Sequence, residues 1–353
     1  MLRNGFPVLA AVLLSASVCM ADVDVENGNA ESFTLSAYAR VRFGQFGGTL
    51  EIPDRSFFIE SAGLSADFRI TDNTEGQLQL ETRPEEIFVK DCYLSWAPLS
   101  MLEVQAGRFK KPFCLNTLLS RWELQSMDHS VTDGELENLL YSGRDIGSML
   151  VLDPDVTGLP ILSLGIFNGS PDWQNQDNEV QYSARAEFRL PMRIVLGAGL
   201  TTLRFGEIDL ESVDGYVCSA RQMAMGGDLQ FSRDISRDLA LQLRGEFVRG
   251  DNWSLADVIS GETAPEFQSW WCTGGLTWLT FKPSLESVTA SVSIGSWEPD
   301  RTADQREDEL SFTLTFDTGS PVTFSAAMIS HRPRNILFEE DRTDYLLEAA
   351  VDL

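Results

Sequence analysis

Residues 102–152 decide the fold; they read LEVQAGRFKKPFCLNTLLSRWELQSMDHSVTDGELENLLYSGRDIGSMLVL. Leu102, Val104 and Ala106 alternate with polar residues or glycine, and this period of two is typical of a β-strand with one apolar face. A second apolar-rich strand closes the stretch. The connection between them, from Phe109 to Tyr141, is too long for an ordinary turn in a compact domain. It therefore predicts a functional loop between two amphipathic strands.

The charges of this loop are separated along the sequence. Basic residues stand at its start, at Arg108, Lys110 and Lys111, and acidic residues follow at Asp128, Asp133, Glu135 and Glu137. A long loop of both charges, held between two amphipathic strands, suits the constriction of a pore.

The same alternation recurs along the rest of the chain. Residues 33–43 alternate over about eleven positions, the length of a tilted strand that crosses a membrane. A soluble sandwich strand is usually about half as long. Similar segments continue to the C-terminal residues 345–353, and we count about sixteen strands, an even number as in bacterial outer-membrane barrels. The sequence predicts an all-β fold, a transmembrane antiparallel β-barrel whose long third loop folds inward.

The connections between these strands alternate between short and long, as in outer-membrane barrels. Short connections are expected at 72–73, 97–98, 190–191, 233–237, 281–284 and 318–321. Long ones are expected at 109–141, 168–179, 204–222, 250–268, 297–308 and 331–343, with a short exception at 83–87. An extra strand over 213–221 is an alternative. Aromatic residues near strand ends predict a girdle at the membrane interface: Trp96, Phe188, Trp270, Trp278, Trp297 and Tyr345.

The N-terminal segment predicts export. Residues 1–21 carry Arg3, an apolar run and a small-x-small site ending at Ala21, the pattern of a cleaved secretory signal peptide. Residues 22–31 are polar and acidic and are expected to form a periplasmic lead-in, and residues 32–353 the barrel domain. The expected location is the outer membrane of a Gram-negative-type envelope, with outer-membrane lipid around the barrel.

Composition excludes several function classes. With 27 Lys and Arg against 53 Asp and Glu, the formal charge is −26, which disfavours binding to nucleic acid. His129 and His331 are the only histidines, too few for a His-based catalytic or zinc site. No dinucleotide, nucleotide or Cys/His metal motif is present. We therefore expect no enzyme activity, catalytic residue, cofactor or metal. Cysteines 92, 114, 218 and 272 are widely spaced, so isolated apolar roles and a disulfide both stay open.

A pore needs charged side chains that face its lumen rather than a reaction centre. Period-two alternation turns a set of arginines inward, and the start of the long loop adds further cations. The predicted anion-binding residues are Arg40, Arg42, Arg108, Lys110, Lys111, Arg185, Arg189 and Arg244. Such a basic row would concentrate anions. Alternatively, the arginines pair with inward carboxylates such as Glu187 and Glu246 and only satisfy the wall.

Four segments carry a family resemblance. VKDCYLSW (89–96), EVQAGRFKKPF (103–113), GRDIGSML (143–150) and LGIFNGS (164–170) resemble, in this order and spacing, the phosphate-selective porin O and P family of outer-membrane channels. The resemblance implies a sixteen-stranded barrel, a homotrimer, and passage of anions or small solutes. It also implies basic residues at the constriction, and Arg108, Lys110 and Lys111 are the positions that match.

The expected function is a passive outer-membrane porin for small hydrophilic solutes, with small anions such as phosphate or oligophosphate as the sharper expectation. Three alternatives stay open. The carboxylates of the long loop would favour a general or cation-preferring porin. A lumen blocked by residues 109–141 would leave a structural barrel. The third alternative is an exported soluble β-sandwich binding module.

Overall fold

The computed structural model describes residues 32–47, 55–83, 86–156, 158–170, 174–175, 178–204, 221–255, 264–282, 284–335 and 341–352. The predicted signal peptide, the lead-in and the alternative strand at 213–221 lie outside these ranges, as does Cys218. Within them, no helix is long and apolar enough to cross a membrane.

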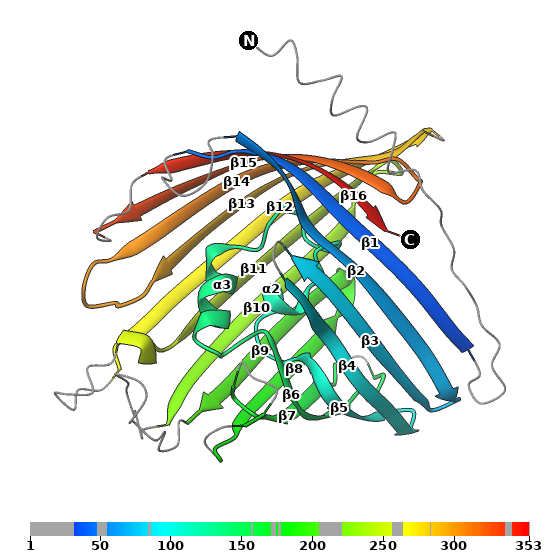
Figure 1. Cartoon of the computed structure of the whole chain (residues 1–353), viewed down its shortest axis with the longest axis vertical. Coiled ribbons are helices and arrows are strands. Elements are labelled where there is room, and N and C mark those ends of the chain that lie inside the picture. Colours follow the sequence, from blue (N-terminus) through cyan, green and yellow to red (C-terminus); the bar gives the residue numbers. More distant parts are fainter. Residues whose placement is uncertain are drawn as a thin grey trace, which may run out of the picture.

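The described strands form one closed antiparallel barrel (Figure 1). Each strand pairs with its sequence neighbours, and β1 pairs with β16 to close the sheet. The strands are β1 (Ser32–Gln45), β2 (Arg55–Thr71), β3 (Thr74–Arg83), β4 (Glu86–Leu99), β5 (Leu102–Lys110), β6 (Arg144–Leu152), β7 (Ile161–Phe167), β8 (Gln181–Leu190), β9 (Ile194–Leu203), β10 (Gln222–Asp234), β11 (Leu239–Asp251), β12 (Glu266–Lys282), β13 (Leu285–Glu298), β14 (Arg306–Asp317), β15 (Val322–Arg334) and β16 (Arg342–Asp352). The predicted sixteen-stranded barrel is confirmed.

Each strand has an apolar outer face and a mostly polar inner face, because successive side chains point to opposite sides of the sheet. In β14, Leu310 and Phe312 are exposed on the outside, whereas Ser311 and Thr313 are buried inside. Five of the six aromatic residues expected in the girdle are exposed: Trp96, Phe188, Trp270, Trp278 and Tyr345. Trp297 is an exception. It shares the inward parity of Ser291 in β13 and is buried in the lumen, so its assignment to the girdle is wrong.

The connections divide the barrel into two ends, which we call the short-turn end and the long-loop end. The turns β2–β3, β4–β5, β8–β9, β10–β11, β12–β13 and β14–β15 lie at the short-turn end. The β5–β6 connection and most of the other long ones lie at the opposite end, and the β3–β4 connection is the short exception there. The alternation read from the sequence is therefore confirmed.

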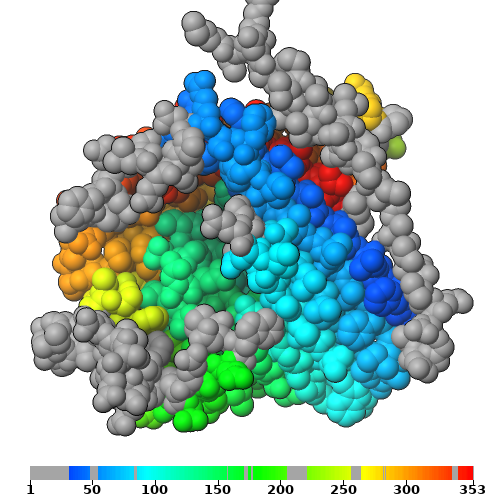
Figure 2. Space-filling view, in the orientation of Figure 1, coloured from blue at the N-terminus to red at the C-terminus, as the bar shows by residue number. Residues whose placement is uncertain are grey.

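Residues 111–143, which we call the constriction loop, fold into the barrel as predicted. The loop carries two helices, α2 (Leu115–Leu118) and α3 (Val131–Asn138). Both lie within the ring of strands in Figure 1. Figure 2 shows teal and green atoms of this part of the chain between the cyan strands on one side and the yellow and orange strands on the other.

The core of the molecule lies inside the lumen rather than between two layers. Phe113, Leu136 and Tyr141 of the constriction loop pack against inward residues of β9–β13, among them Phe267 and Trp297. The rings of Phe267 and Trp297 stack with centroids 4.9 Å apart. Each large apolar side chain buried here contributes about 1.5–3 kcal/mol to keeping the loop in place. The β9–β13 side of the lumen is therefore filled by packed side chains.

Three cysteines lie in the described part of the chain, and none of them forms a disulfide there. Cys92 and Cys272 are exposed on the outer face, and Cys114 is buried at the start of α2. For these three, the alternative of isolated side chains holds.

Candidate functional site

A cavity of about 800 Å³ remains open on the side of the lumen that the core does not fill. It lies between the constriction loop and the inner faces of β1–β4 and β14–β16. Ser36 and Asp352 line it near the short-turn end, and His331 and Arg342 line it near the long-loop end. The cavity thus extends along most of the barrel, as a path for solutes would.

The first helix of the constriction loop is fixed by a buried carboxylate of the wall. Glu246 in β11 accepts hydrogen bonds from the backbone N–H groups of Leu115 (2.6 Å) and Asn116 (3.3 Å). It also accepts one from the indole N–H of Trp271 at 2.9 Å. Three donors converge on one side chain that is only 5% exposed. The start of α2 is therefore tied to the β11–β12 wall.

Further hydrogen bonds fix the middle of the loop to the same side of the barrel. The Gln125 side-chain amide donates to Gln242 (2.9 Å), and the Arg244 guanidinium donates to the Glu123 carbonyl. The backbone N–H of Val131 donates to Glu309 at 3.1 Å. With this many anchors to β11 and β14, the loop is held as part of the wall.

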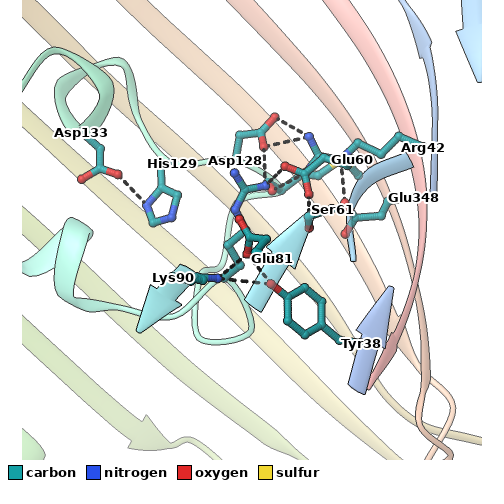
Figure 3. A network of polar contacts seen from close by, with 12 residues as sticks. Tyr38, Arg42, Glu60, Ser61, Glu81, Lys90, Asp128, His129, Asp133 and Glu348 are labelled. Atoms are coloured by element: carbon teal, nitrogen blue, oxygen red, sulfur yellow. Dashed lines mark hydrogen bonds and ion pairs between the residues drawn. The ribbon is translucent and has the colours of Figure 1, made fainter. Parts of the chain in front are cut away.

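The tip of the loop reaches the opposite wall through ion pairs, which Figure 3 shows around Asp128. The Arg42 guanidinium of β1 lies 2.9 Å from the Asp128 carboxylate and 2.6 Å from that of Glu348 in β16. Arg121 of the loop pairs with Glu60 of β2. The Arg42 and Glu348 side chains are 5% and 8% exposed, so this pair is largely removed from water. The loop thus crosses the lumen and is fixed at both sides.

Wall residues of the cavity form ion pairs of their own. Lys90 of β4 donates to Glu81 of β3 at 2.5 Å, and the Tyr38 hydroxyl of β1 donates to the same carboxylate (Figure 3). Arg144, the first residue of β6, donates to Asp91 at 2.9 Å. Lys90 and Glu81 join neighbouring strands, whereas the other two contacts each cross an intervening strand. Together they neutralise much of the basic charge on this wall.

The helix α3 gives the opposite side of the cavity an acidic face. Asp133, Glu135 and Glu137 all line the cavity, and the helix carries no basic residue. Asp133 accepts a hydrogen bond from Thr117 and lies 3.0 Å from His129 Nδ1. Burial raises the pKa of Asp133, opposed by the Thr117 hydrogen bond and by Lys110.

His129 is neutral at pH 7. Burial, together with the nearby charges of Arg121 and Lys110, lowers its pKa to about 4. The folded pKa lies below the usual value of about 6.5, so the folded state binds fewer protons than the unfolded state. The stability contribution of neutral His129 is therefore complete above about pH 6.5 and is lost as pH falls towards 4.

We expect the protein to lose stability between about pH 6.5 and 4, and His129→Gln to reduce that loss. Unfolding in guanidinium, followed at pH 7 and pH 5, measures the difference. His331→Gln is the matched control, because His331 lies at the long-loop end of β15 outside the constriction loop. Identical pH slopes for the wild type and His129→Gln would contradict the expectation.

Two of the eight predicted anion-binding residues line the large cavity. Arg40 lies over the ring of Trp122, 4.4 Å from its centroid. Lys110 donates to the carbonyls of Leu118 (3.0 Å) and Leu119 (2.8 Å). Both therefore stand at the boundary between the loop and the open lumen.

Four others serve the packing of the lumen. Arg42 and Arg244 hold the constriction loop, and Arg185 forms a two-bonded pair with Asp228 at 2.6 and 2.9 Å. Lys111 is 2% exposed and donates to the Leu140 carbonyl at 2.6 Å. Burial lowers the pKa of Lys111 to about 8. The alternative that inward arginines pair with carboxylates of the wall describes Arg42, which pairs with Glu348, and Arg185, which pairs with Asp228.

The remaining two lie away from the constriction. Arg189 is near the short-turn end of β8, and its exposed side chain lies 3.5 Å from Asp153. Arg108 is not among the residues that line the cavity. It is paired in register with Cys92, which is exposed on the outer face, and its Nε donates to the Val89 carbonyl at 3.2 Å.

Sequence reasoning missed most of the residues that build the site. Glu60, Glu81, Arg121 and Glu348 lie in no motif. Lys90 and Arg144 lie in two of the segments that carry the family resemblance but were not assigned to the site. For the residues on strands, alternation could have shown which side chains face inward. It could not have shown their partners, which lie on other strands or in the loop. Within the described ranges, no group of three or more His, Cys, Asp or Glu residues is placed to hold a metal ion.

No protein-family model matches the sequence, and no curated protein matches it. Solved structures do match. The outer-membrane channel DcaP of Acinetobacter baumannii aligns with a TM-score of 0.63 at 10% identity, covering 95% of this chain and all (100%) of that one. Salmonella typhi OmpF in complex with daunomycin aligns with a TM-score of 0.63 at 12% identity, covering 94% of this chain and 100% of that one.

The anion-selective porin of Comamonas acidovorans aligns with a TM-score of 0.61 at 9% identity, covering 91% of this chain and 99% of that one. At such identities the likeness shows the fold alone. The chain has the closed sixteen-stranded barrel of outer-membrane porins.

Proposed function

We propose that the protein is a passive outer-membrane diffusion channel for small hydrophilic solutes. One observation carries the proposal: a polar cavity of about 800 Å³ runs beside a loop that is fixed to both sides of the lumen. A fixed loop narrows a barrel without closing it, so this geometry favours an open channel over a blocked structural barrel. The porin-type fold neighbours support the same role and a role without catalysis.

Swelling of proteoliposomes in isotonic sugar solutions tests the proposal. Liposomes that contain the protein should swell quickly in small sugars such as arabinose and slowly in larger oligosaccharides, because the constriction limits size. Liposomes without protein set the background. Equal, background-level swelling in every sugar would contradict an open channel and favour the structural alternative.

Weak selectivity between ions is the first part of the proposal. Carboxylates outnumber basic groups in the cavity lining, and several of the basic groups are paired. The charges of the lining therefore do not produce a strong electrostatic potential of one sign along the cavity. This favours the general-porin alternative over a phosphate-specific channel.

A preference for anions such as phosphate is a second candidate, and a specific observation favours it. Arg40, Lys110 and Arg342 line the cavity, and none of them forms an ion pair with a carboxylate within the described ranges. Cations that are not neutralised locally attract anions into a narrow passage. Together with this candidate function we propose membership of the phosphate-selective porin O and P family.

We expect Lys110→Gln to shift the reversal potential across a KCl gradient towards cation preference, because it removes one of these three charges. Lys282→Gln is the matched control, since Lys282 is an exposed lysine at the short-turn end of β12. An unchanged potential in Lys110→Gln would exclude this lysine as a selectivity determinant. A fall in current on addition of phosphate would favour the phosphate candidate.

The assembly that we propose is a homotrimer in the outer membrane, exported by a cleaved signal peptide. One similar structure, OmpT of Vibrio cholerae folded in vitro, is described in a trimer form; it is 12% identical and has a TM-score of 0.56. Light scattering of the detergent-solubilised protein measures the number of chains, and N-terminal sequencing of protein from membranes locates the cleavage.

A further inference from the structure

Arg40 is an inward arginine of the cavity whose guanidinium has no polar partner in the described part of the chain. It is 3% exposed, and no hydrogen bond or ion pair joins it to any residue within the described ranges. Because Arg40 lines the cavity, its N–H groups meet the solvent of the cavity rather than a protein acceptor. The arrangement is therefore that of a donor group which lacks its acceptor.

The nearby carboxylates do not fill this role. Glu348 is bonded to Arg42 at 2.6 Å, and Glu60 is paired with Arg121. Both interact with Arg40 through space only. Both carboxylates are already paired with other arginines. An acceptor for Arg40 therefore has to come from the cavity that it lines.

Trp122 adds an apolar surface directly beside this donor. The guanidinium carbon of Arg40 lies 4.4 Å from the centroid of the indole, a cation–π contact. The Trp122 side chain is nevertheless 41% exposed and lines the same cavity. A guanidinium that stacks on a ring keeps its N–H groups in its own plane, where they can still donate to an acceptor.

We propose that Arg40 and Trp122 form a subsite for monoanionic aromatic carboxylates on their way through the channel. The carboxylate would accept hydrogen bonds from Arg40, and the aromatic ring would pack on the exposed part of the indole. This inference rests on the proposed function, because it needs the cavity to be reached by solutes.

The surroundings of the subsite explain why both the ring and the single charge are needed. Glu60, Asp128 and Glu348 lie close to Arg40 or to its neighbour Arg42, so a bare anion gains little and a dianion is repelled. Contact with Trp122 supplies the additional free energy that a small anion such as acetate lacks. The subsite therefore selects against phosphate dianions as well as against acetate.

Single-channel recording with three probes tests the inference. Benzoate has the ring and the charge, acetate has only the charge, and benzamide has only the ring. We expect benzoate to interrupt the KCl current in a concentration-dependent way, with acetate and benzamide about tenfold or more weaker, since each lacks one of the two interactions.

Two variants and two matched controls assign the effect to this site. Arg40→Gln and Trp122→Leu should each weaken the benzoate block by about tenfold. Arg189→Gln removes an arginine at the short-turn end, and Trp278→Leu removes an exposed outer-face tryptophan; both should leave the block unchanged. Arg40→Lys keeps the charge, and unchanged gel migration of the unheated protein shows that each variant is folded.

The outcomes separate this inference from the proposed function. A KCl current that benzoate and acetate reduce equally, or a benzoate block that survives both Arg40→Gln and Trp122→Leu, overturns the subsite while the channel stands. If the folded protein carries no current, the channel proposal fails. The subsite is then judged by calorimetric titration of benzoate into the detergent-solubilised protein and the same variants, where an absence of binding overturns it.

Discussion

Replacing Glu246 with alanine is expected to raise the single-channel conductance and the current noise of the protein. The substitution leaves the N–H groups of Leu115, Asn116 and Trp271 without their shared acceptor in the packed side of the lumen. Each buried donor left unpaired costs about 1–3 kcal/mol. The cheapest way to recover that free energy is for α2 to leave the wall and take up water, which loosens the constriction loop.

Two further variants make the Glu246 result specific. Glu246→Gln keeps an acceptor oxygen and should have a smaller effect. Glu103→Ala is the matched control, because Glu103 is an inward carboxylate of β5 that bonds to Ser95 of the neighbouring strand at 2.5 Å rather than to the loop. If Glu246→Ala and Glu103→Ala had the same conductance as the wild type, Glu246 would not be an anchor of the constriction loop.

Arg42→Gln is expected to have the largest effect on stability, lowering the free energy of unfolding by about 3–5 kcal/mol. The substitution leaves Glu348 as an uncompensated charge that is 8% exposed. It also releases Asp128 and the Met127 carbonyl, which accepts from Arg42 at 3.1 Å. Because β1 and β16 close the barrel, the loss acts on barrel closure and on the loop tip together. Equilibrium unfolding in guanidinium with lipid or detergent present measures it.

A double-mutant cycle separates these contributions. Glu348→Gln combined with Arg42→Gln removes both charges, so the double variant should be more stable than Arg42→Gln alone. Arg189→Gln serves as the control, since its side chain is 61% exposed and should change stability little. Additive losses from the two substitutions would show that Arg42 and Glu348 have no coupling free energy.

The barrel could be predicted because its signals are local. Alternation over residues 33–43 and 310–317 indicates both that the segment is a strand and which of its faces points to the membrane. The lengths of the connections distinguish the two ends of the barrel. The inward position of Arg40 and the inward path of the constriction loop followed from the same reasoning. The assignment of Trp297 to the girdle was wrong because alternation was not applied at the end of β13, where it turns this side chain inward.

The partners of the site could not be predicted, because they are set by closure of the barrel. Arg42 and Glu348 are separated by 306 positions in sequence and meet only where β1 pairs with β16. Glu246 meets Leu115 only after the loop has folded into the lumen. Which inward arginine is neutralised and which is left free, as Arg40 is, depends on these distant contacts and leaves no trace in spacing or composition.

Single-channel recording of the purified, folded protein in planar bilayers tests the central claim most directly. A channel beside a fixed constriction loop predicts uniform conductance steps in KCl that stay open at low voltage, with larger and noisier steps in Glu246→Ala. A protein that shows the gel shift of a folded barrel and yet gives no steps, in the wild type and in Glu246→Ala alike, would contradict an open lumen.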